Sequence, residues 1–338
     1  MSTDIQLTQD LTQTQTLFEN EQSSEAPTVV QRIPHLQAVF SRHETFHPRF
    51  GWIKKGFDRT CQDRKVFLRD DATTTLGVGK NMVRSIRYWC TAFKVLEEVQ
   101  EKGGRARELR PTSFGTKLLA DDGWDPYLED PGSLWLLHWY LLKPSCIATT
   151  WYFTFACFQR VEFSFESLFL TLKDYVQSQI SSKNAVADSS LQKDISCLIH
   201  MYASLKARDN AIEDMLDSPF ATLGIIQSAS DGKHFSFHMG HKSALPSEII
   251  VAACLEFADS IGKGERTISI SRLMYEEGSP GVLFKLTESV LCHAIEHVAQ
   301  KDQRIYLSDS SGLIQMAFTQ HPAVLAESIL DHYYNNEW

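Results

Sequence analysis

The chain has 338 residues, of which 43% are hydrophobic and 22% are charged. These values are typical of a globular protein and allow two or three domains with proper cores. No apolar run is long enough to cross a bilayer, and no basic-then-apolar signal pattern opens the chain, so we expect a cytoplasmic protein with no membrane partner.

The net charge of −9 is unevenly distributed along the chain. Residues 42–110 contain 16 Lys and Arg against nine Asp and Glu, whereas the remainder contains 17 basic and 33 acidic residues. The basic segment predicts a surface that contacts a polyanion such as nucleic acid, and the acidic remainder predicts a surface for a basic partner.

The cysteines argue against a disulfide framework. They are odd in number, widely spread and free of any C-x-x-C pair, which also disfavours a zinc knuckle or an iron–sulfur site. Six of them lie in apolar surroundings, where we expect reduced, buried thiols: Cys90, Cys146, Cys157, Cys197, Cys254 and Cys292.

Residues 1–32 are rich in Gln, Thr, Ser and Glu and have few apolar anchors, so we predict a disordered tail. The first half of residues 38–57 alternates as a strand would, and residues 52–57 read as a short helix closed by Gly56. Aromatics alternate here with cations. We expect Phe46, Phe50 and Trp52 in the core. The cations that we expect against phosphates are Arg42, Arg49, Lys54 and Lys55.

Residues 70–89 read as a helix, a tight turn with two glycines, and a second helix. Apolar residues recur at spacings of three and four, which predicts an inward stripe on the second helix. The stripe comprises Met82, Val83, Ile86, Trp89, Cys90, Phe93 and Leu96. The outward face carries Lys80, Asn81, Arg84, Ser85 and Arg87. This is where a helix-turn-helix protein places the residues that enter the major groove.

Gly103, Gly104 and the arginines of residues 105–110 read as a short hairpin, the wing of a winged helix-turn-helix. The alternative is an ordinary pair of helices with a solvated basic face. Under the first interpretation, the DNA-contacting residues are Arg49, Lys54, Lys55, Lys80, Asn81, Arg84, Arg87, Arg105 and Arg107.

Three blocks, residues 46–56, 76–83 leading to Tyr88 and Trp89, and 111–115, carry a family resemblance. They resemble a bacterial domain-of-unknown-function family found in DNA phosphorothioation gene clusters. Its neighbours there are a PAPS-reductase-like sulfur-transfer protein and a cysteine desulfurase, and its best characterised member is described as a DNA nickase. The likeness extends from about residue 38 to the C-terminus, and residues 76–83 are its most specific part. The resemblance implies a role on DNA but transfers no catalytic residue.

The middle of the chain reads as helical. Residues 121–133 form an acidic turn, which is either a magnesium site or a solvated turn whose aspartate or Ser133 caps the next helix. Residues 134–142 predict a buried helix, residues 150–176 an aromatic helical core, residues 181–190 a linker, and residues 191–205 an amphipathic helix.

The C-terminal part repeats the first pattern. Residues 268–275 predict a helix, residues 277–281 a turn, and residues 282–300 a longer helix. Residues 304–307 and 313–316 predict a hairpin. The second helix exposes Glu288, Glu296 and only one lysine, Lys285, so this unit is better suited to docking a protein than to binding phosphates.

Candidate catalytic residues are few. His43, Glu44 and His47 lie beside the basic segment, and we select His47, Asp70 and Asp71 as the candidates for nicking. Residues 293–297 match H-x-x-E-H, but too little chain follows for a third zinc ligand. His234 and His238 share one face of a predicted strand and read as solvated histidines more readily than as a metal site.

We therefore predict a mainly α protein with small β-hairpins. Its predicted parts are the tail, a basic winged-helix DNA-binding domain at 33–125, a helical bundle at 126–226 and a winged-helix-like interaction domain at 227–338. The expected function is DNA binding within a phosphorothioate-modification or phage-defence system, with a sulfur-transfer protein, an ATPase and a cysteine desulfurase as partners. One strand would be nicked with Mg²⁺ or Mn²⁺ as cofactor. The alternatives are a DNA-presenting adaptor without enzymatic activity and a winged-helix transcriptional regulator.

Overall fold

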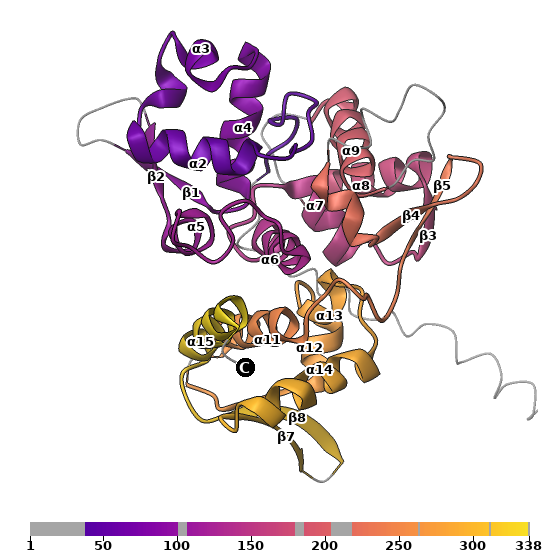
Figure 1. Cartoon of the computed structure of the whole chain (residues 1–338). Helices are drawn as coiled ribbons and strands as arrows, with labels where there is room; N and C mark the ends of the chain where they lie inside the picture. Colours follow the sequence, from indigo (N-terminus) through magenta and orange to yellow (C-terminus); the bar gives the residue numbers. More distant parts are fainter. Residues whose placement is uncertain are drawn as a thin grey trace, which may run out of the picture. The chain divides into compact units, whose positions relative to one another are not determined.

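The structure, a computed structural model, describes residues 38–100, 107–179, 186–203, 218–262, 264–310 and 312–336. The predicted tail at residues 1–32 and the predicted DNA contact Arg105 lie outside these residues. As predicted, the described chain is mainly helical, and its strands form small antiparallel sheets (Figure 1). None of its helices combines the length and the hydropathy that crossing a bilayer requires.

The N-terminal elements, indigo to purple in Figure 1, assemble around the packing of one helix, α2, on another, α4. Ile86 and Cys90 of α4 lie against Gly56 of α2 in this contact. The elements are α2 (Trp52–Gln62), the 3₁₀ turn η1 (Val66–Leu68), α3 (Ala72–Leu76), α4 (Lys80–Ala92), β1 (Leu96–Gln100), β2 (Arg107–Pro111) and α5 (Ser113–Leu119). β1 and β2 form the predicted hairpin, with Leu96 opposite Pro111 and Gln100 opposite Arg107.

Two predictions for residues 38–57 are wrong. Residues 38–50 form turns rather than a strand, because Ser41, Glu44 and Thr45 have positive φ angles that break an extended backbone. The first helix does not end at Gly56 but continues to Gln62. Gly56 serves close packing instead, since a Cβ atom there would lie 2.5 Å from the Cys90 sulfur.

The middle elements combine helices with a sheet that the prediction of a pure helical bundle missed. Strands of this sheet run in the order β3–β5–β4, with Phe163 opposite Phe235. Residues 188–190, predicted as linker, already belong to a helix. The elements are α6 (Pro131–Leu142), α7 (Thr149–Tyr152), the π-helical turn η2 (Phe153–Cys157), β3 (Glu162–Ser164), α8 (Phe165–Gln179), α9 (Asp188–Tyr202), the 3₁₀ turn η3 (Pro219–Leu223), β4 (Ile226–Ser228) and β5 (His234–Phe237).

A chain of buried aromatic rings joins α4 to these middle elements. The Trp89 ring lies 5.3 Å from the Trp151 ring and 5.6 Å from the Phe93 ring, and Phe93 stacks on Phe220 at 5.1 Å. Each such pair contributes about 0.5–1.5 kcal/mol beyond simple burial. The inward face of α4 is therefore held firmly, which fixes the direction of its outward face.

The C-terminal elements, orange to yellow in Figure 1, pack α11 against α14 and α15. The predicted hairpin is present as β7 and β8, and a third strand, β6, joins it in the order β6–β8–β7. The elements are α11 (Ser247–Ile261), β6 (Thr267–Ser269), α12 (Ile270–Tyr275), α13 (Pro280–Leu283), α14 (Glu288–Lys301), β7 (Ile305–Ser310), β8 (Leu313–Phe318) and α15 (Pro322–Asn335).

The long helix predicted at residues 282–300 is broken. α13 ends at Leu283 and α14 begins at Glu288, because Lys285 between them has a φ angle of 55°. Lys285 was predicted to be exposed, but it is buried, and its ammonium donates a hydrogen bond to the Phe155 carbonyl at 2.7 Å. The predicted domain boundaries at 125 and 226 stay predictions.

Candidate nucleic-acid interface

Helices α3 and α4 are joined by the short turn of Gly77, Val78 and Gly79. Gly77 ends α3 in the left-handed conformation, at a φ of 66°, which a residue with a side chain adopts at a cost. The Val78 amide then donates to the Thr73 carbonyl at 3.1 Å. Gly79 caps α4 with an extended backbone. The two glycines thus supply the sharp change of direction that the sequence predicts.

The inward stripe is confirmed within α4, because Val83, Ile86, Trp89 and Cys90 are all buried. The helix ends at Ala92, however, so Leu96, predicted on the stripe, is buried at the start of β1 instead. Ser85 is a correction: it was predicted on the outward face but is fully buried. Its hydroxyl donates to the Phe46 carbonyl at 3.3 Å, so it belongs to the packing of the preceding segment.

The outward face of α4 presents Lys80, Asn81 and Arg84, all exposed, within its first turns. No acidic residue lies in the first turn, so the positive end of the helix dipole adds to the two cations. Arg84 lies 3.5 Å from Glu44, and within the described ranges no acidic side chain pairs with Lys80. This end of α4 favours an anionic ligand.

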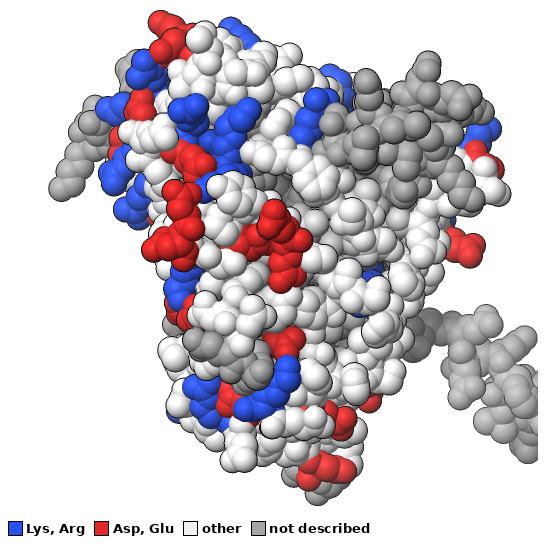
Figure 2. Space-filling model, viewed as in Figure 1, with Lys and Arg blue, Asp and Glu red and all other residues white. Residues whose placement is uncertain are grey.

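Arg87 of α4 and the predicted cations of the hairpin are paired with acidic neighbours. Glu98 binds both Arg87 and Arg107 at 3.1 Å, and Glu97 binds Arg110 at 2.7 Å. Figure 2 accordingly shows blue and red side chains interspersed over the face that carries α2 and the hairpin. Exposed pairs of this kind contribute about 0–1 kcal/mol each, so a phosphate can replace the carboxylate at little cost.

Lys54 is a correction among the predicted DNA contacts. Only 8% of the residue is exposed. Its ammonium donates to the Leu119 carbonyl at 2.9 Å and to Asp121 at 2.8 Å, and it lies 2.9 Å from Asp58. Burial lowers the pKa of Lys54, but the hydrogen bonds that its ammonium donates to Asp121 and Asp58 outweigh it and raise the pKa overall. Lys54 therefore ties α2 to the end of α5.

The other predicted cations of this region keep access to solvent. Lys55 is exposed and donates to the Leu76 carbonyl at 3.3 Å. Arg49 is half-buried, with its guanidinium 5.6 Å from the Trp52 ring centroid. Trp52 is buried as predicted and Phe46 is half-buried, whereas Phe50 is a correction because 57% of it is exposed.

The three candidate catalytic residues come from two separate segments. His47 is half-buried in the segment before α2. Asp71 binds the Arg69 guanidinium through both carboxylate oxygens at 2.7 Å, and this hydrogen bonding lowers the pKa of Asp71. Asp70 is exposed beside it. Within the described chain the three residues do not form a group that could hold a metal ion together.

His43 is also a correction, since it was predicted beside the exposed basic segment. It is fully buried, and its Nε2 donates to Asp194 on α9 at 2.8 Å. Asp194 also accepts from the Ser41 amide and the Thr150 hydroxyl, each at 2.8 Å. Sequence reasoning missed this anchor. The sequence feature that could have predicted it is Asp194, a carboxylate within the apolar stripe of the amphipathic helix.

The remaining candidate ligand groups have structural partners. Asp130 accepts from the Gly132 amide at 2.7 Å and caps α6, which confirms the capping interpretation of the acidic turn. His234 binds Asp231, and β5 ends before His238, so the two histidines do not share a strand. His297 faces Glu248 at 3.8 Å. Among the described residues, no three His, Cys, Asp or Glu side chains lie close enough to hold a metal ion.

The thiols largely follow the prediction. Cys90, Cys146, Cys197 and Cys254 are buried, whereas Cys157 and Cys292 are only half-buried. Burial raises the pKa of the Cys90 thiol. It likewise raises the pKa of the Cys146, Cys197 and Cys254 thiols. They are therefore neutral and unreactive near neutral pH.

Residues 40–334 match the model of a protein family of unknown function, DUF4007. The chain belongs to the DUF4007 family. This confirms the resemblance drawn from residues 46–56, 76–83 and 111–115. No curated protein matches the chain.

Two solved structures resemble this DUF4007 chain across most of its length. One is a magnesium ion-bound SspB crystal structure with a TM-score of 0.84, and the other is an SspB crystal structure with a TM-score of 0.82. Each is 36% identical to this chain, and each comparison covers 89% of both chains.

The magnesium ion of that SspB structure raises the question of whether this DUF4007 chain holds one at the predicted site. The residues selected for that role do not fit, because Asp71 is engaged by Arg69 and His47 belongs to a different segment. Magnesium prefers hard oxygen ligands and usually takes one or two carboxylates together with water or substrate phosphates. Within the described residues, His47, Asp70 and Asp71 therefore do not form a magnesium site together.

Proposed function

We propose that this protein engages DNA as a component of a DNA phosphorothioate-modification and phage-defence system. The observation that carries the proposal is the similarity to SspB over 89% of the chain. The family resemblance of the sequence implies the same setting. The charge distribution supports it, because the basic residues concentrate in the segment that contains α2 to β2.

In this proposal residues 33–125 form a winged helix-turn-helix domain that binds duplex DNA. Lys80, Asn81 and Arg84 at the start of α4 contact the major groove and its phosphates. The β1–β2 hairpin is the wing, and Arg87 and Arg107 exchange their Glu98 pairing for phosphate contacts. Lys55 and Arg49 add contacts from the flank, whereas Lys54 has no role because its ammonium is buried.

The remaining parts take the other roles. Residues 126–226 form the helical middle, and residues 227–338 form a winged-helix-like interaction domain. Their partners are a PAPS-reductase-like sulfur-transfer protein, an ATPase and a cysteine desulfurase, as the family resemblance implies.

A second candidate function is nicking of one strand so that a partner can insert sulfur. The observation that favours it is that a similar structure, SspB, is described with a bound magnesium ion. Without nicking, the protein is a DNA-presenting adaptor. A transcriptional regulator is the remaining alternative, and a dimer on a palindromic site would indicate it.

One gel experiment tests these functions together. Purified protein is incubated with supercoiled plasmid and with a short linear duplex, in Mg²⁺, in Mn²⁺ and in EDTA. We expect retardation of both DNAs by the wild-type protein. The variant Lys80→Glu with Arg84→Glu should lose retardation while its thermal unfolding is unchanged, because both side chains are exposed. A matched control, Arg160→Glu with Arg266→Glu, reverses two exposed charges in connections before β3 and before β6 and should retain it.

The outcomes separate the candidates. Metal-dependent conversion to open circles, abolished in His47→Ala or Asp70→Ala, would establish a nickase and the assigned residues. Retardation without a nick would establish the adaptor role. Absence of retardation by the wild-type protein would contradict the proposed function.

A further inference from the structure

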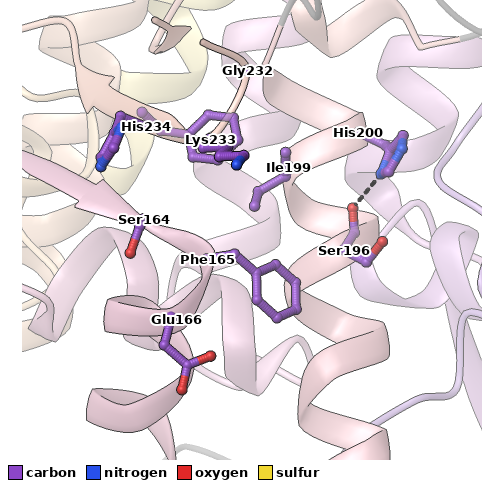
Figure 3. Close-up of a pocket in the computed structure, with 10 residues that line it drawn as sticks. Ser164, Phe165, Glu166, Ser196, Ile199, His200, Gly232, Lys233 and His234 are labelled. Atoms are coloured by element: carbon purple, nitrogen blue, oxygen red, sulfur yellow. Dashed lines mark hydrogen bonds between the residues drawn. The ribbon is translucent and has the colours of Figure 1, made fainter.

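A cavity of about 560 Å³ opens between the start of α8, the exposed side of α9 and the turn before β5 (Figure 3). Ligand sites for small organic molecules have volumes of roughly 300–1,000 Å³, so this cavity is large enough for one nucleoside. Ile199 and Phe235 form a buried apolar part of its wall. In Figure 3 the Phe165 ring lies between β3 and α9 and offers a surface for stacking.

Polar side chains also line the cavity. Glu166 lines the cavity from α8 and Lys233 from the turn before β5, and both residues are exposed. A carboxylate accepts hydrogen bonds from the amino group of a base, and an ammonium donates to its ring nitrogen or carbonyl. The cavity therefore combines an aromatic face with hydrogen-bond acceptors and donors, which is the composition of a nucleobase site.

A second cavity of about 300 Å³ adjoins the first, because Ser196 and His200 line both. Its character differs from that of the first. Arg49 and the exposed Lys193 line it, together with His47. Two cationic side chains that line the same cavity can bind a phosphate group next to the base site.

The second cavity is lined in part by a segment that is hydrogen-bonded to the proposed recognition helix. Phe46, which lines it, is held to α4 by two hydrogen bonds to its carbonyl oxygen, from Trp89 Nε1 at 2.9 Å and from the Ser85 hydroxyl. Glu44 of the same segment faces Arg84. Hydrogen bonds from His43 and Ser41 to Asp194 fix the other end of the segment on α9. The segment that lines the cationic cavity is therefore tied to both α4 and α9.

We propose that the two cavities bind one nucleotide turned out of a DNA strand. The base stacks on Phe165 against Ile199, and its phosphate lies beside Arg49 and Lys193. This inference rests on the proposed function, because it requires that α4 first binds the duplex. It gives a role to His47, which would lie beside the phosphate of the extruded nucleotide.

The test measures binding to two labelled duplexes, one fully paired and one carrying 2-aminopurine opposite an abasic site. 2-Aminopurine is quenched by the bases that neighbour it in a duplex, and stacking on a phenylalanine ring quenches it far less. We expect the protein to prefer the abasic duplex by about tenfold and to raise its fluorescence. The variant Ser196→Phe places a ring at a position that lines both cavities, and should lose this preference while binding the paired duplex as the wild type does. Lys193→Glu should weaken binding to the abasic duplex several-fold.

Ser189→Phe is the matched control, because it places the same ring at an exposed position of α9 outside both cavities. It should behave as the wild type. Equal binding of the two duplexes by the wild type, without a fluorescence change, would overturn the inference and leave the proposed function intact. Failure to bind either duplex would overturn both. Binding of free dAMP with no preference for the abasic duplex would show a site for free nucleotides and would contradict capture from a strand.

Discussion

At the scale of single residues, His138 shows how burial sets a charge state. Its Nε2 donates to the Leu283 carbonyl at 3.1 Å, and its Nδ1 accepts from the Tyr202 hydroxyl at 2.7 Å. Burial lowers its pKa to about 3, so the imidazole is neutral at neutral pH. It therefore links α6 to α9 and α13 as an uncharged hydrogen-bonding group.

The lowered pKa of His138 predicts acid destabilisation. The unfolded chain binds a proton at this histidine below pH 6.5, whereas the folded chain does so only near pH 3, so the free energy of unfolding falls as the pH drops between these values. We expect this group to account for a loss of about 2 kcal/mol between pH 7 and pH 5. His138→Gln keeps a neutral side chain and should show a loss smaller by that amount in urea unfolding. Parallel losses in both proteins would contradict this account.

Lys54 and Ser85 show which residue predictions the sequence could not support. Each lies at a helical position where the apolar spacing is compatible with a buried or an exposed side chain. Because both side chains are polar, an exposed position was favoured. What decides is the neighbour on the adjoining segment: the Leu119 carbonyl with Asp121 for Lys54, and the Phe46 carbonyl for Ser85. These partners come from segments distant in sequence, which a periodicity argument does not see.

At the scale of elements, the junction between the β1–β2 hairpin and α5 depends on one glycine. A Cβ atom at Gly115 would lie 2.0 Å from the Val95 carbonyl oxygen, which is backbone and cannot move aside. The Gly115 amide donates to the Thr112 side chain that caps α5. The hairpin, its preceding turn and the helix thus meet in direct backbone contact.

Gly115→Ala is expected to destabilise the protein. Alanine would gain about 0.5–1 kcal/mol from helix propensity, but overpacking against fixed backbone costs about 1–3 kcal/mol, so the clash prevails. The measurement is the midpoint of urea unfolding. Gly79→Ser is the control, because nothing lies within 4 Å of its Cβ position and serine is a good helix cap, so its midpoint should stay or rise. An unchanged midpoint for Gly115→Ala would show that the hairpin moves freely against α5.

Local signals predicted elements well where neighbours in sequence determine them. The turn between α3 and α4, the inward stripe of α4 and both hairpins follow from glycine positions and apolar spacing. These local signals did not predict the break at Lys285 or the sheet of β3, β5 and β4. The break and the sheet depend on a buried ammonium that reaches the Phe155 carbonyl and on strands separated by two long helices.

At the scale of the whole molecule, the sequence located the basic region but not the arrangement of the site. The concentration of cations in residues 42–110 is visible from composition. The pairing of Arg87 and Arg107 with Glu98, and the anchoring of residues 41–46 between α4 and α9, become visible only in the fold. The two adjoining cavities depend on that anchoring, so no sequence motif predicts them.

The central claim is that the start of α4 binds DNA phosphates, and the salt dependence of binding tests it most directly. The slope of log affinity against log salt changes by about 0.9 for each phosphate that the protein neutralises. Replacing Lys80 and Arg84 by glutamine in one protein should therefore reduce the slope by roughly 2. Arg160→Gln with Arg266→Gln, which alters the net charge equally, should leave it unchanged. Equal slopes for the wild type and the Lys80 and Arg84 variant would contradict the assignment of the interface to α4.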